Sequence, residues 1–131
     1  MIVISKKDLR IKNLSKYRYR ELKYLCLQYS ELKDKLRELS YESIKAVQIT
    51  GMPSAHNISN STQDIVIKKT EIERKIKAIE QAVIEADSIY YKDILYSVTE
   101  NIRYEYINTK LCRTSFYMLR RLFFSILDEK I

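Results

Sequence analysis

Apolar residues in the first part of the chain recur at alternating intervals of three and four. After Ser15 this seam consists of Leu22, Leu25, Tyr29, Leu32, Leu36 and Leu39. Such spacing places side chains along one face of a helix and does not fit the twofold alternation of a strand. Ser5 and Asp8 form a capping-box pattern, and Ser15 offers a second N-cap. The pattern predicts a long helix over about residues 5–49.

The segment Thr50-Gly51-Met52-Pro53 ends that helix, because glycine accepts the left-handed conformation and proline cannot extend the hydrogen-bond ladder. We expect a loop over residues 51–61 and a second helix over residues 62–87, with Ser61 and Asp64 as its capping box. The second helix carries its own seam, in which Ile72, Ile76, Ile79 and Val83 are followed by Ala86 and Tyr90.

Two facing seams predict an antiparallel, coiled-coil-like helical hairpin over residues 1–87. The residues of both seams, from Leu22 to Leu39 and from Ile72 to Val83, are its expected protein interface. The pattern fits closure within one chain and pairing of two copies equally well.

From Ser88 onward the chain becomes rich in tyrosine and phenylalanine. Breaks at Glu100-Asn101 and Cys112-Arg113 predict three short helices, over residues 88–99, 103–110 and 114–129. A basic helix at the end of three small helices is typical of a helix-turn-helix. The predicted fold class is therefore all-α, with a hairpin domain at 1–87 and a helix-turn-helix region at 88–131.

The last of these helices has one apolar stripe, consisting of Phe116, Leu119, Phe123, Ile126 and Leu127, which we expect in the core. Among the aromatic residues, we expect Tyr117 and Phe124 to be exposed. The opposite side carries no acidic residue before Asp128. It presents Thr114, Tyr117, Met118, Arg121 and Ser125, flanked by Arg113 and Arg120.

In a helix-turn-helix, side chains in the first turns of the second helix meet base edges in the major groove. Arginine pairs with guanine, hydroxyls serve several acceptors, and Met118 would pack against a thymine methyl. Arg120 is the expected phosphate contact, while Arg121 is the expected base contact. The DNA-binding residues predicted from this pattern are Arg113, Thr114, Ser115, Tyr117, Met118, Arg120 and Arg121. The alternative is an ordinary solvated surface helix.

The charge balance favours a polyanionic partner, since 24 basic and 17 acidic residues leave a formal charge of +7. A second basic cluster at the N-terminus has only Asp8 and Glu21 as nearby acids. It could contact phosphates or an acidic protein, and it fits a solvated helix face as well. Its members are Lys6, Lys7, Arg10, Lys12, Lys16, Arg18, Arg20 and Lys23.

Catalytic and metal chemistry find no support in the sequence. Cys26 and Cys112 are far apart, and His56 is the one histidine and stands in the expected loop, so we predict no metal site, no cofactor and no enzyme activity. One glycine cannot build a phosphate-binding loop. Without a signal-peptide pattern or an apolar run near 18 residues, the expected location is the bacterial cytoplasm, away from membranes.

The C-terminal run Thr114-Ser-Phe-Tyr-Met-Leu-Arg-Arg-Leu-Phe-Phe resembles the end of the RinA/ArpU-like phage transcriptional regulators. The N-terminal Lys-Lys-Asp-Leu, the Gly51-Met52-Pro53 hinge and residues 94–99 agree in order. The resemblance implies a sigma-factor-like DNA-binding end, with Thr114, Ser115, Tyr117, Arg120 and Arg121 on the recognition helix. Met118, Leu119 and Leu122 are apolar where basic residues are expected.

The leading hypothesis is a DNA-binding transcriptional regulator of phage, prophage or mobile-element genes. It would bind double-stranded DNA with its C-terminal helix, and its hairpin would bind protein, either host RNA polymerase or a second copy in a dimer. The apolar residues within the basic run favour the alternative, a helical adapter or antagonist without independent DNA binding. A small terminase-like packaging role is a further alternative.

Overall fold

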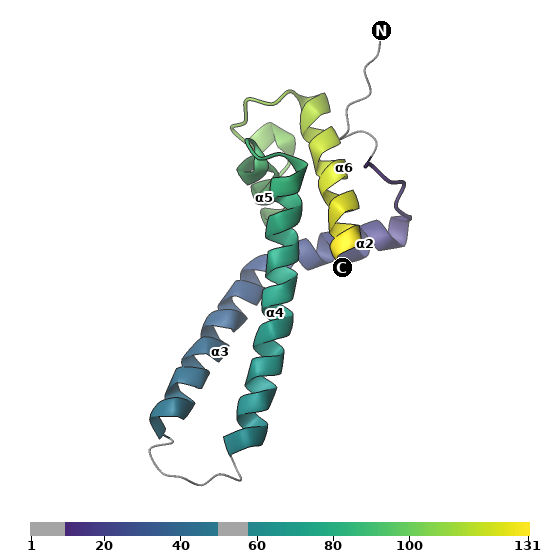
Figure 1. The fold of residues 1–131 in the computed structure, drawn as a ribbon. Helices are drawn as coiled ribbons and strands as arrows, with labels where there is room; N and C mark the ends of the chain where they lie inside the picture. Colours follow the sequence, from purple (N-terminus) through teal and green to yellow (C-terminus); the bar gives the residue numbers. More distant parts are fainter. Residues whose placement is uncertain (1–9, 50–57) are drawn as a thin grey trace. The chain divides into compact units, whose positions relative to one another are not determined.

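The computed structural model describes residues 10–49 and 58–131, with side chains described at 10–42 and 63–131. Within these ranges the chain is all-helical and has no strand, as the sequence predicts (Figure 1). The helices are α2 (Lys16–Leu27), α3 (Tyr29–Ile49), α4 (Ile58–Ala86), α5 (Tyr91–Glu100) and α6 (Arg113–Lys130), and a single 3-10 turn, η1 (Tyr104–Tyr106), lies between the last two. None of the helices described is both long and apolar enough to cross a membrane.

The helix expected over residues 5–49 is divided at Gln28 into α2 and α3. Ser15 is the N-cap of α2, and its hydroxyl accepts a hydrogen bond from the amide of Arg18 at 3.2 Å. The alternative start at Ser5 lies outside the described residues. Helix α4 begins at Ile58, so the second helix starts earlier than the predicted residue 62, while residues 50–57 of the expected loop lie outside the described ranges.

The chain forms two compact units whose boundaries differ from the predicted domains. Unit 1 combines the chain up to Tyr29 with Lys77–Ile131, and unit 2 is Ser30–Ile76. The predicted boundary at residue 87 therefore falls inside unit 1. The reason is that α2 and the last turns of α4 pack with the C-terminal helices instead of forming a separate hairpin domain.

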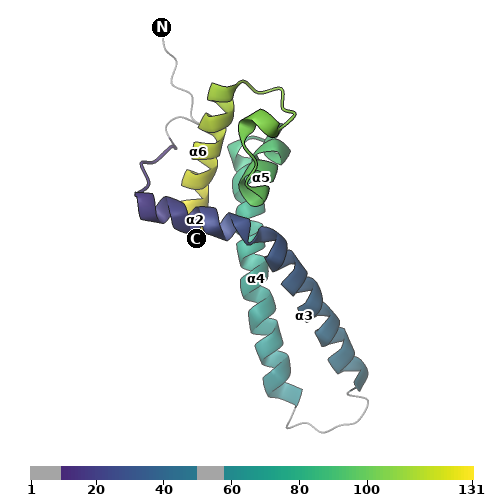
Figure 2. The ribbon, with the colours of Figure 1, turned by 180° about the vertical axis from the view of Figure 1, so that it is seen from behind.

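Unit 1 is built around α6. Phe116, Phe123 and Leu127 of α6 are fully buried together with Ile94 of α5 and Leu22 of α2. Burying a phenylalanine or leucine side chain contributes about 1.5–3 kcal/mol. Figure 2 shows α2 crossing the pair formed by α5 and α6. The apolar stripe predicted for the last helix is confirmed, with each of its members at most 3% exposed.

Half of the predicted hairpin seam belongs to this core. Leu22, Ile79 and Val83 are buried in it, and Leu25 and Tyr29 pack against it in a partly buried state. The seam pattern therefore identified buried residues correctly, but it gave no sign that the C-terminal helices would cover them.

Unit 2 holds α3 and the first turns of α4. Leu32 and Ile76 are each 6% exposed, whereas Leu36, Leu39 and Ile72 are half-buried. A cavity of about 290 Å³ opens beside Leu39 and Ile72. The two helices of this unit diverge toward residues 49 and 58 in both views of the ribbon.

The segment between α5 and α6 is an ordered loop with one 3-10 turn, which differs from the helix expected over residues 103–110. Asn101 ends α5 in the left-handed conformation (φ 55°), which asparagine tolerates better than most residues. The loop is held by two side chains: the hydroxyl of Tyr104 donates to the carbonyl of Leu111 at 2.7 Å, and that of Thr109 donates to the Asp93 carboxylate at 2.8 Å. Local polar bonds thus replace a third helix.

Candidate nucleic-acid interface

Helix α6 has an open side along its first two and a half turns. We call the residues of this side the open stripe; it consists of Arg113, Thr114, Tyr117, Met118 and Arg121. Arg113, Thr114 and Arg121 are exposed, while Tyr117 and Met118 are half-buried. The buried neighbours Phe116 and Leu119 turn the helix so that this side faces outward. The structure therefore brings five of the seven predicted DNA-binding residues to one accessible surface.

Aromatic packing fixes the beginning of the open stripe. The Tyr104 ring lies 5.2 Å from that of Phe116 and 6.4 Å from that of Tyr117, measured between centroids. The guanidinium of Arg113 stands 5.7 Å from the centre of the Tyr117 ring and forms an ion pair with Glu105 at 3.1 Å. Both partners of that pair are exposed, so it is readily exchanged for another anion.

The contacts of Ser115 indicate a structural role and not the predicted DNA contact. It is half-buried, and its hydroxyl lies 3.2 Å from the sulfur of Cys112, the residue that precedes α6. Bonding to the side chain and backbone of Ser115 lowers the pKa of the Cys112 thiol. Ser115 thus stabilises the first turn of the helix.

Arg120, the predicted phosphate contact, is half-buried and lies apart from the open stripe. Its guanidinium is 5.9 Å from the centre of the Phe124 ring, and its Nε atom is buried without a hydrogen-bond partner in the described structure. Its charge opposes, but does not outweigh, the burial that raises the pKa of Cys26 to about 12. Arg120 therefore packs against Phe124 and lies close enough to Cys26 of α2 to act on its thiol.

The second half of α6 is covered. Ser125, expected on the open side, is 1% exposed, and Phe124, also expected to be exposed, is 2% exposed. The backbone amide of Lys12 donates to the Ser125 hydroxyl at 2.9 Å, and the Tyr19 ring packs edge-on against Phe124 at 5.0 Å. The wheel pattern could not reveal this, because the covering residues stand more than a hundred positions away.

Ion pairs hold the same N-terminal segment against the end of α6. Arg18 donates to Asp128 at 2.6 Å, and Lys12 lies 3.1 Å from Glu129. The bond to Asp128 raises the pKa of Arg18. We call this group the terminal ion-pair cluster; it comprises Arg10, Lys12, Arg18, Glu85, Asp128, Glu129 and Lys130. Three cations of the predicted N-terminal basic cluster are therefore neutralised within the chain.

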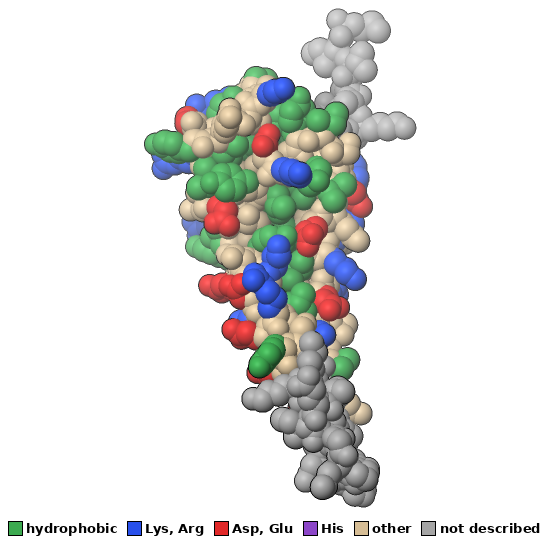
Figure 3. Space-filling view, turned by 90° about the vertical axis from the view of Figure 1, so that its left-hand side faces the viewer, with side chains coloured by type: hydrophobic (Ala, Val, Ile, Leu, Met, Phe, Trp, Pro, Cys, Tyr) green, Lys and Arg blue, Asp and Glu red, His purple; other side chains and the backbone are tan. Residues whose placement is uncertain are grey.

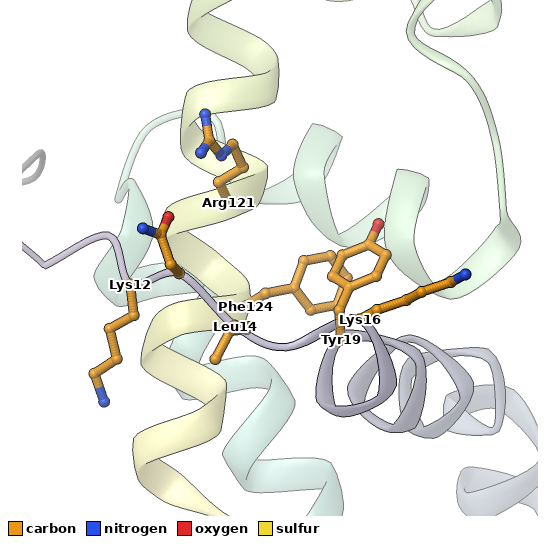
Figure 4. A pocket seen from close by; sticks show the side chains of 7 residues that line it. Lys12, Leu14, Lys16, Tyr19, Arg121 and Phe124 are labelled. Carbon is orange, nitrogen blue, oxygen red and sulfur yellow. The ribbon is translucent and has the colours of Figure 1, made fainter.

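A cavity beside Arg121 combines Lys16 of the predicted N-terminal basic cluster with residues that the sequence did not single out as a site. Asn13, Leu14, Lys16 and Tyr19 line it together with Phe124 (Figure 4). A pattern search along the sequence had no means of pairing these residues with Arg121, since only the fold brings them together.

Elsewhere, acidic and basic side chains are interspersed on the face that Figure 3 views. In the part of the chain that the structure describes, no group of three or more histidine, cysteine or acidic residues is arranged to hold a metal ion. His56 lies outside the described residues.

Comparisons of the chain with models of protein families, with curated proteins and with solved structures found no match.

Proposed function

We propose that the protein binds double-stranded DNA through the open stripe of α6 and acts as a transcriptional regulator of phage, prophage or mobile-element genes. Three features support this: the exposed arginines of the open stripe, the formal charge of +7, and the resemblance of residues 114–124 to the RinA/ArpU-like regulators. The acidic residues of α6, Asp128 and Glu129, lie at its C-terminal end. There they pair with Arg18 and Lys12.

The observation that carries the proposal is the length and charge of the open stripe. From Arg113 to Arg121 the helix rises about 12 Å, at 1.5 Å per residue, and the major groove of DNA admits an α-helix. Helix α6 contributes no carboxylate over this length, since its first acidic residue is Asp128. A phosphate backbone would thus meet no repulsion from the helix that approaches it.

The open stripe suggests a division of roles. Arg121 would pair with a guanine edge, and Thr114 and Met118 would contact neighbouring bases. Arg113 stands at the helix start, where the positive end of the helix dipole also favours a phosphate. We therefore assign the phosphate contact to Arg113, because Arg120 is packed against Phe124.

Fluorescence anisotropy with labelled duplexes tests these roles, using a pool of random duplexes and a site selected from that pool. We expect Arg121→Ala to weaken binding to the selected site by about 1–3 kcal/mol and to leave random duplex less affected. Arg113→Ala should weaken binding to the selected site and to random duplexes by a similar factor. Arg37→Ala in α3 is the control, because Arg37 is exposed and its one ion pair among the described residues is with Asp34 at 2.9 Å. Equal losses on every sequence for both stripe variants would contradict the roles.

A second candidate function, protein binding by unit 2, rests on the partly buried seam residues of α3 and α4, among them Leu36, Leu39 and Ile72. Leu39 and Ile72 border a cavity, and Val66 and Ile67 on α4 are more than half exposed. Exposed apolar side chains bordered by charged residues are common at protein interfaces. We propose a homodimer as the partner arrangement, with host RNA polymerase as the further partner of a regulator.

Analytical ultracentrifugation tests the homodimer. Ile67→Lys places a charge on an exposed position, so it should leave the fold intact and shift the population toward monomer. Lys77→Glu, at an exposed position of α4 that does not line this cavity, alters charge without removing apolar area and serves as the control. A monomeric wild-type chain at all concentrations would reject the homodimer and leave a different protein as the partner of this surface.

A further inference from the structure

The cavity beside Arg121 has the size and lining of a small-ligand site. Its volume is about 500 Å³, within the range of about 300–1,000 Å³ found for small-molecule sites. One wall is α6, which supplies Arg121 and Phe124. The other wall is the N-terminal segment with the start of α2, which supplies Asn13, Leu14, Lys16 and Tyr19.

The charges at the cavity favour an anion. Arg121 and Lys16 make no ion pair within the described part of the chain, and none of the lining residues is acidic. A third lining cation, Lys12, is engaged by Glu129 at 3.1 Å, and Figure 4 shows it extending away from Arg121. In that view the Arg121 guanidinium and the Tyr19 hydroxyl lie on the same side of Phe124. The planar donors of arginine suit a phosphate oxygen pair.

The apolar part of the lining favours a ligand that also carries a ring. Leu14 and Tyr19 are half-buried, and Phe124 fixes the Tyr19 ring by an edge-on contact at 5.0 Å between centroids. A tyrosine held in this way offers a firm surface for a planar ring, as in proteins that stack nucleobases on aromatic side chains. Inorganic phosphate would leave this surface unused.

From this combination we infer that the cavity between the N-terminal segment and α6 binds a nucleoside phosphate, with its phosphate at Arg121 and its base against Tyr19. The ligand is either a free nucleotide or one nucleotide unit of a single strand, since both present the same chemistry. The inference does not rest on duplex binding by the open stripe: Asn13, Leu14, Lys16 and Tyr19 lie outside that surface.

Isothermal titration calorimetry on the full chain at low ionic strength tests the inference with adenosine 5′-monophosphate, adenosine and inorganic phosphate. We expect saturable binding of the nucleotide, at least about tenfold tighter than either fragment. Arg121→Ala should reduce nucleotide affinity to that of adenosine, because only the phosphate contact is lost. Tyr19→Leu should weaken the binding of the nucleotide and of adenosine by the same factor. If the leucine variant is unstable, Tyr19→Phe replaces it and should retain the affinity that the ring contributes.

Arg20→Ala provides the matched control, since Arg20 is an exposed cation on α2 that does not line the cavity. It should change nucleotide affinity less than about twofold. Arg113→Ala separates the two proposals, because it should weaken duplex binding and leave nucleotide affinity unchanged. Tighter binding of a 5′-phosphorylated dinucleotide, with the same dependence on Arg121 and Tyr19, would support the inference and identify a strand as the source. Nucleotide binding no tighter than phosphate, equal losses in Arg20→Ala and Arg121→Ala, or no saturation up to about 10 mM would overturn it.

Discussion

The backbone amide of Lys12 donates a hydrogen bond to the side-chain hydroxyl of Ser125, 2.9 Å away and 113 positions later in the chain. The same hydroxyl donates to the carbonyl of Arg121 at 3.0 Å. Ser125 therefore joins the N-terminal segment to the last helix. This junction limits the open stripe to the residues before it and holds Lys12, which lines the cavity beside Arg121.

Ser125→Ala should lower the free energy of unfolding by about 0.5–1.5 kcal/mol, because the Lys12 amide loses the acceptor of its partly buried hydrogen bond. Urea denaturation followed by circular dichroism measures the change. Ser88→Ala is the control, since Ser88 is exposed. An unchanged midpoint for Ser125→Ala would mean that the N-terminal segment does not close over α6.

The ion pair between Arg18 and Asp128 should contribute more to the free energy of unfolding than an exposed ion pair does. Its side chains are 33% and 23% exposed, and Nε of Arg18 lies 2.6 Å from Oδ1 of Asp128. A double-mutant cycle with Arg18→Ala and Asp128→Ala should give a coupling of about 1 kcal/mol or more, as for a charged hydrogen bond.

The pair Arg37–Asp34 provides the matched cycle, because both side chains are mostly exposed, at 77% and 62%. Its coupling should not exceed about 0.5 kcal/mol. If the two cycles gave equal couplings, the terminal ion-pair cluster would have no special part in holding the N-terminus.

Stability should fall in acid partly through Glu129. The hydrogen bond and the charge of Lys12 hold the pKa of this carboxyl below its ordinary value of 4.5. Because the folded state favours the charged form, its contribution is present above that value and is lost as the pH falls through the lowered pKa.

The difference in unfolding free energy between wild type and Glu129→Gln should therefore shrink between about pH 5 and pH 3. Glu100→Gln is the control, since Glu100 is exposed and makes no ion pair in the described structure. A difference that stays constant or widens toward low pH would contradict the assigned interaction.

The two cysteines should react at very different rates. Burial raises the pKa of Cys26 to about 12, whereas bonding to Ser115 lowers that of the exposed Cys112. Since the thiolate is the reactive form, iodoacetamide at pH 8 should label Cys112 quickly and Cys26 only when the chain unfolds. Mass spectrometry of the native protein should show one modification, and rapid labelling of both thiols would mean that the α2–α6 contact is open.

The helical class, the Ser15 cap and the buried stripe of α6 could be predicted because each depends on local spacing. Residues three and four apart share a helix face whatever the rest of the chain does. Phe116 and Phe123 were therefore placed correctly. The seam residues Leu22 and Ile79 were also recognised as buried, but the local pattern does not specify the elements against which they pack.

The predictions that the structure contradicts concern contacts between segments that are distant in the sequence. Ser125 and Phe124 lie where a helical wheel gives an open face, and only the return of residues 12–19 to α6 buries them. The loop before α6 was expected to be a helix, because helical periodicity does not reveal the side-chain bonds of Tyr104 to Leu111 and of Thr109 to Asp93 that hold the loop instead. Within the candidate site, helical periodicity predicted the open stripe. It did not predict the cavity beside Arg121.

The dependence of random-duplex binding on salt is the most direct test of the proposal that the open stripe of α6 contacts DNA. Between about 50 and 200 mM salt, the affinity should fall linearly on logarithmic axes as neutralised phosphates release their counterions. Arg113→Ala should make that slope shallower by about one, and Arg37→Ala should leave it unchanged. No detectable binding at the lowest salt, or a slope that is the same in wild type and Arg113→Ala, would contradict the proposal.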